Sequence, residues 1–99
     1  MTRKIDLTVN NTPVNLDYFV AGYLDHVIGG ILDSLHGTGD IKKLRLTLNG
    51  EDARINLNGE DVPLNYFANE IVRSTLLGML APLKGVESPV NTVELNIER

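Results

Sequence analysis

A chain of 99 residues with 42% apolar side chains can bury one compact hydrophobic core but hardly two. Its lack of cysteine excludes disulfides, thiolate metal sites and thiol nucleophiles, and it suits a reducing compartment such as the cytoplasm. The formal net charge of −4 repels phosphate backbones, so no nucleic-acid partner is expected.

The first expected element is a strand over residues 5–9, where apolar and polar residues alternate. Because this alternation starts near the amino terminus, where a secretory signal needs an unbroken apolar stretch, no export signal is expected. A loose turn at 10–13 leads to a short returning arm at 14–16. Asp17 follows, and its side-chain oxygen can cap the first turn of a helix.

The first helix is expected to run from about residue 18 and to end at Gly37, because apolar residues recur at a spacing of three to four. Charged residues interrupt this segment, so it should not cross a bilayer and no membrane contact is expected. The expected buried stripe is Val20, Leu24, Val27, Ile28, Ile31 and Leu35, and the expected polar side holds Asp25, His26, Gly29, Asp33 and His36.

The next strand is expected at 44–48, followed by a hairpin at 49–52 and a strand at 53–57. The register of this hairpin can be set by the apolar pattern, because only one alignment brings every apolar residue to one face. That alignment pairs Leu48 with Ala53, Leu46 with Ile55 and Leu44 with Leu57.

A second arm and helix follow the turn Asn58-Gly59, a strong hairpin signal because both residues tolerate positive φ. The arm is expected at 62–64, with Asn65 as the helix cap. Pro82 has no amide hydrogen, so the helix should kink or tighten in its last turn, and Gly85 should end it. The expected buried stripe is Ala68, Ile71, Val72, Thr75, Leu76, Met79 and Leu83, whereas Leu77 lies on the polar side with Asn69, Glu70, Arg73 and Ser74.

The two halves of the chain resemble each other when one is shifted by 48 residues. We therefore expect a single domain, residues 1–99, made of two pseudo-symmetric repeats at about 4–49 and 52–98. Glycine costs a helix interior up to about 1 kcal/mol, so Gly30 and Gly78 at equivalent positions predict that the helices cross closely there. The aligned segments are 9–19 with 57–67, 30–37 with 78–85 and, after one inserted residue, 44–48 with 93–97.

The architecture that follows is an α+β fold with a mostly antiparallel sheet of four to six strands and two helices on one face. If the repeats are related by a twofold, the last strand, 93–97, pairs with the first strand. The alternative is a ferredoxin-like βαββαβ sandwich, which needs the first and third long strands at the centre and turns the arms into loops. The turn at Asn58-Gly59 favours paired arms.

No catalytic residue, metal or cofactor is expected. Among the polar residues of helix one, His26 and Asp33 are two turns apart, roughly 10 Å along the axis, which is too far to share one ion. The Gly-x-Gly at 37–39 follows a helix, whereas the dinucleotide motif follows a strand. The polar set Asp25, His26, Asp33 and His36 is therefore interpreted as a solvated face.

The function expected is a non-catalytic protein-interaction or assembly module in the cytoplasm, with a protein partner or self-association. Leu77 is a candidate contact for such a partner. The alternative is a small-ligand-binding protein or minor enzyme with a cleft near the helix starts, where Tyr18 and Tyr66 would line a shared pocket. The pairs Tyr18-Phe19 and Tyr66-Phe67 are otherwise expected to pack in the core, with the tyrosine hydroxyls at its rim.

Overall fold

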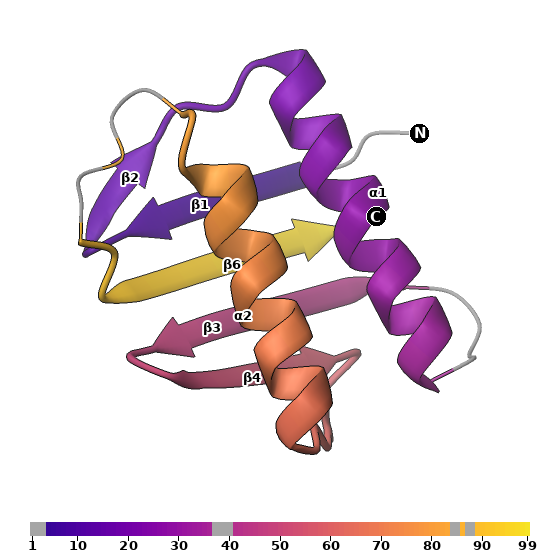
Figure 1. The fold of residues 1–99 in the computed structure, drawn as a ribbon. Helices are drawn as coiled ribbons and strands as arrows, with labels where there is room; N and C mark the ends of the chain where they lie inside the picture. Colours follow the sequence, from indigo (N-terminus) through magenta and orange to yellow (C-terminus); the bar gives the residue numbers. More distant parts are fainter. Residues whose placement is uncertain (1–3, 37–40, 84–85, 87–88) are drawn as a thin grey trace.

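The computed structural model describes residues 4–36, 41–83, 86 and 89–99. These residues form one antiparallel sheet of six strands, and two helices cover one of its faces (Figure 1). The chain is an α+β fold, as the sequence predicted. The strands are β1 (Lys4–Val9), β2 (Thr12–Val14), β3 (Lys43–Asn49), β4 (Asp52–Leu57), β5 (Glu60–Val62) and β6 (Thr92–Glu98), and the helices are α1 (Tyr18–His36) and α2 (Tyr66–Leu80).

The sheet has the strand order β2-β1-β6-β3-β4-β5. The last strand, β6, therefore lies between β1 and β3, which confirms the predicted pairing of the last strand with the first. In the observed register Val93 is opposite Val9. A ferredoxin-like sandwich would instead have the first and third long strands, β1 and β4, at its centre. That alternative is wrong, because the central pair is β6 and β3.

The hairpin of β3 and β4 has the register expected from its apolar pattern, with Leu48 opposite Ala53 and Leu46 opposite Ile55. Both arms pair as edge strands, but two residues earlier than expected, because each turn is only two residues long. The first turn is as tight as the second, contrary to expectation: Asn10 and Asn11 have φ of 50° and 64°, and Asn58 and Gly59 have φ of 53° and 90°.

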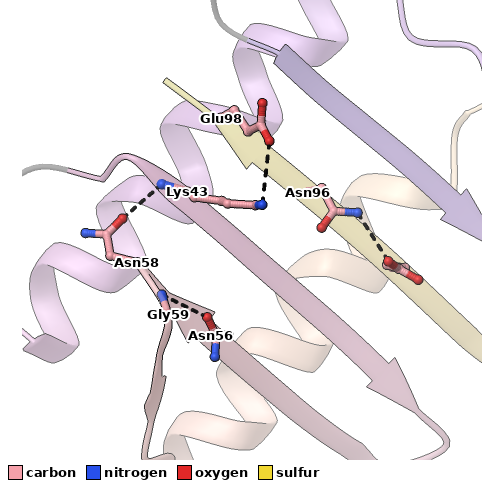
Figure 2. Close-up of polar contacts among 7 residues, drawn as sticks. Lys43, Asn56, Asn58, Gly59, Asn96 and Glu98 are labelled. Carbon is pink, nitrogen blue, oxygen red and sulfur yellow. Dashed lines mark hydrogen bonds and ion pairs between the residues drawn. The ribbon is translucent and has the colours of Figure 1, made fainter.

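Two asparagines join the ends of neighbouring strands. The Oδ1 of Asn58 accepts hydrogen bonds from the backbone amides of Lys42 and Lys43, both at 2.9 Å, where the chain enters β3. Figure 2 shows the bond to Lys43. The Oδ1 of Asn10 accepts from the amides of Asn91 at 2.7 Å and Thr92 at 3.1 Å, where the chain enters β6. Each asparagine thus fixes where a central strand starts, a role that the sequence analysis did not predict.

The hydrophobic core lies between the sheet and the two helices. The buried rows differ from those expected at several positions. Leu32 and Leu80 join them, and Ile71 is exposed. The expected residues that are only partly buried are Val20, Val27, Ile31, Thr75 and Leu83. Neither helix in the described part of the chain is long and apolar enough to cross a membrane. The core is formed mainly by Leu7, Val9, Leu24, Ile28, Leu32, Leu44, Leu46, Leu48, Ile55, Val72, Leu76, Leu80, Val93, Leu95 and Ile97.

The second helix ends at Leu80, five residues before the expected stop at Gly85. Beyond it the chain tightens, as Pro82 predicted, because the amide of Leu83 donates to the carbonyl of Leu80 at 3.0 Å. Gly37 and Gly85 lie outside the described residues, as do the side chains of Leu35 and His36.

The expected close helix crossing at Gly30 and Gly78 is wrong. A Cβ atom built on either glycine meets no atom within 4 Å, so both positions face open space. The glycines are on the side of each helix that points away from the sheet, since the buried residues occupy the opposite side.

Candidate interaction surface

Each helix begins at a side-chain cap, as predicted. The amide of Val20 donates to the Oδ1 of Asp17 at 2.7 Å, and the amide of Ala68 donates to the Oδ1 of Asn65 at 2.7 Å. These bonds satisfy amides that the first helical turn otherwise leaves without an acceptor. They also fix the two aromatic pairs at the first two positions of α1 and α2.

The aromatic pairs lie on the surface, so the expectation that they pack in the core is wrong. Tyr18 is 97% exposed and Phe19 75%, while Tyr66 is 84% exposed and Phe67 72%. The reason is their place in the helix: the residue that follows each pair is the first to face the core, and the side chains before it project from the helix end. A repeated aromatic pair therefore marks the surface in this protein.

One helical turn further on, each pair is extended by another exposed side chain. Tyr23 is 49% exposed and stacks on Phe19, with ring centroids 6.1 Å apart, and Ile71 is 42% exposed one turn after Phe67. Among the described residues, every large apolar side chain that is strongly exposed belongs to one of two groups. We call these groups the aromatic patches: patch one is Tyr18, Phe19 and Tyr23, and patch two is Tyr66, Phe67 and Ile71.

Both patches continue along the outer side of their helices. On each helix a row of residues begins at the phenylalanine of the patch and continues at spacings of four, three and four residues. These spacings keep the row on one helical face, opposite the buried residues. All of these positions are exposed, and within the described parts of α1 and α2 the only charged residue that extends either row is Asp33, at the end of the first. We call them the outer rows, which are Phe19, Tyr23, His26 and Gly30 on α1 and Phe67, Ile71, Ser74 and Gly78 on α2.

The two helices run in opposite directions, so their starts lie at opposite ends of the helix layer (Figure 1). Tyr18 and Tyr66 therefore do not converge, and this arrangement gives no support to a single pocket between them. A partly open hollow of ≈ 230 Å³ lies instead at the sheet edge formed by β4 and β5. It is lined by Ala53, Arg54, Ile55, Asp61, Val62 and Leu64.

This hollow is a weak candidate for a ligand site. Its volume is below the roughly 300–1,000 Å³ of typical small-molecule pockets. One of its two charged side chains, Asp61, already accepts a hydrogen bond from the Nδ2 of Asn56 at 3.1 Å. The neighbouring backbone is also occupied, because the amide of Ala53 donates to the Oδ1 of Asn69 at 2.8 Å.

Leu77, the expected partner contact, is partly buried and packs against the core cluster. Its position on the polar side of α2 does not make it a prominent surface residue. Its burial accounts for an apolar residue at that position without a partner.

The polar residues that were expected on one solvated face of α1 are not all exposed. His26 and Asp33 are exposed as expected, but Asp25 is fully buried, so its assignment to a solvated face is wrong. Arg99 lies against its carboxylate: Nε donates to Oδ1 at 2.9 Å and Nη2 lies 2.8 Å from the same oxygen. The described residues contain no group of three or more acidic or histidine side chains able to hold a metal ion.

Gly29 makes room for this ion pair, which separates its role from that of Gly30. A Cβ on Gly29 lies 2.9 Å from the Nη2 of Arg99, whereas a Cβ on Gly30 meets nothing. We expect Gly30→Ala to raise the free energy of unfolding by about 0.5–1 kcal/mol through helix propensity, and Gly29→Ala to gain less because the guanidinium must shift. Urea denaturation followed by circular dichroism measures both; equal gains would contradict the proposed role of Gly29.

The opposite face of the sheet is polar and carries both signs of charge. Lys43 lies 3.9 Å from Glu98, and the Nη2 of Arg45 donates to Glu94 at 2.8 Å (the Lys43 pair is drawn in Figure 2). Cations interleaved with carboxylates do not form the continuous basic surface that a phosphate backbone needs.

The chain matches no family model, no curated protein and no solved structure. The aromatic patches are thus the feature that best suggests a function.

Proposed function

We propose that this protein is a non-catalytic interaction module that binds other protein surfaces through its two aromatic patches. The observation that carries the proposal is the exposure of six large apolar side chains in two groups. With about 200 Å² for a fully exposed aromatic side chain, each patch offers roughly 400 Å² of apolar surface. Patches of this size on a water-exposed surface are often functional, and tyrosine and phenylalanine are enriched in interface cores.

We propose further that the patches are equivalent because the chain is a tandem repeat, with units at about 4–49 and 52–98. The strand order supports this idea, because it reads alike from either edge when the units are exchanged. The capping asparagines support it independently. Asn10 and Asn58 are 48 residues apart, while the amides they accept are 49 apart, as the single inserted residue requires. Fusion of an ancestral homodimer would give this pattern.

The module is proposed to act in the cytoplasm, in keeping with the absence of cysteine. The runner-up, a small-ligand binder or minor enzyme, has less support. The hollow at β4 and β5 gives it little support, because Asp61 there is already engaged in a hydrogen bond.

Photocrosslinking in cells tests the proposal, because it captures a bound protein whatever its identity. We expect p-benzoylphenylalanine at Phe19 or at Phe67 to yield discrete protein adducts on illumination in the organism that encodes the chain. The matched control carries the same residue at Asp6, which is exposed on the polar face of the sheet. Adducts that form equally at Asp6, or at none of the three positions, would exclude the aromatic patches as docking surfaces.

A further inference from the structure

We propose that a second copy of this chain docks on the outer helix face, so that the protein forms a homodimer with its helix layers in contact. This inference rests on the proposed function and gives it a specific partner. The outer rows that extend the patches are both on the side of the helix layer that faces away from the sheet.

The area of the patches fits one partner that covers both. Together they offer roughly 800 Å² of apolar surface, by the same value for an exposed aromatic side chain. A stable protein interface buries about 800 Å² on each side. One patch alone supplies about half of that area and would support only a weak contact.

A partner that covers both patches must present matching apolar surfaces on one face and at the same separation. A second copy meets this condition by construction, because it has the same two patches at opposite ends of its own helix layer (Figure 1). A twofold axis in the plane between the layers lets each patch meet a patch of the other copy, the closed arrangement that most homodimers adopt.

The surface between the patches suits such a contact. Between the patches the outer rows contain His26, Ser74 and the two glycines, and the one described charge that extends them is Asp33, at the end of the first row. Because Gly30 and Gly78 have open space above them, the backbone of a partner can approach closely there. Association of two copies is opposed by the electrostatic repulsion between two chains of net charge −4, and added salt screens this repulsion.

Sedimentation of the purified full chain over a range of concentrations tests the inference. We expect the mass to rise from 10.9 kDa toward twice that value, and the association to strengthen with added salt. Phe19→Ser with Phe67→Ser should weaken the dimer by roughly a hundredfold or more, since truncated aromatic anchors often cost tenfold each. Arg54→Ser, on the polar face of the sheet, is the matched control and should dimerise like the wild type.

Several outcomes would overturn the inference. A dimer that persists in the double serine variant, with the fold checked by circular dichroism, would locate the contact elsewhere. A chain that stays monomeric at millimolar concentration, or binds phosphatidylcholine vesicles instead of itself, would exclude a second copy. If cells still gave adducts to a different protein at Phe19, the inference alone would fail and the proposed function would stand.

Discussion

Arg99→Met is expected to lower the free energy of unfolding by about 2–3 kcal/mol, although the residue is near the end of the chain. Its guanidinium contacts the Oδ1 of Asp25 at 2.8 Å, and that carboxylate is fully buried. Methionine keeps most of the side-chain volume and removes the charge, so the change reports the ion pair. Urea denaturation followed by circular dichroism gives the value directly.

The control for this change is Arg54→Met, an exposed arginine whose replacement should alter the free energy of unfolding by less than about 0.5 kcal/mol. A double-mutant cycle with Asp25→Asn adds a second criterion, because two groups in direct contact should couple by about 1–3 kcal/mol. Additive effects of the two substitutions would show that the pair contributes little.

Asn58→Ala is expected to lower the free energy of unfolding by about 2–3 kcal/mol, because it removes the acceptor for two amides and replaces asparagine, which tolerates a φ of 53°, with alanine, which tolerates it less well. Asn58→Gly should cost about half as much, since glycine tolerates that φ. Asn10→Ala should cost a similar amount, because Asn10 also accepts from two amides and has a φ of 50°. The side chain of Asn10 also donates from Nδ2 to the carbonyl of Pro89, at 3.0 Å.

Asn11 provides the internal control, because it shares the positive φ of Asn10 and does not cap a neighbouring strand. We expect Asn11→Ala to lower the free energy of unfolding by no more than about 1 kcal/mol, because it changes only how well the residue tolerates its positive φ. Thermal or urea unfolding distinguishes the two roles. A similar loss at Asn10 and Asn11 would mean that backbone conformation, and not capping, determines the effect.

The sheet could be predicted from the sequence because strand register is a local property with a strong energetic signal. A slip of one residue between β3 and β4 would turn every leucine to the solvent, so Leu46 had to face Ile55. The helix caps were predictable for a similar reason, since Asp17 and Asn65 act on amides three residues away.

The candidate surface was harder to predict, because it depends on where the helices lie relative to the sheet. Periodicity assigned Asp25 to the polar side of α1, but its partner is 74 residues away in the chain and brings that side into the interior. The aromatic pairs have the composition of a core. Only the position of the first inward-facing residue, Val20 or Ala68, reveals that they project outward.

The location of β6 between β1 and β3 affects how the protein can be made. While the chain is being synthesised, β1 and β3 emerge with an empty place between them, which β6 can fill only after β4, β5 and α2 have emerged. Hydrogen bonding across the middle of the sheet must therefore wait until β6 has been synthesised. Contacts between residues so distant in the chain generally slow folding, so this small protein should acquire its structure late and in one concerted step.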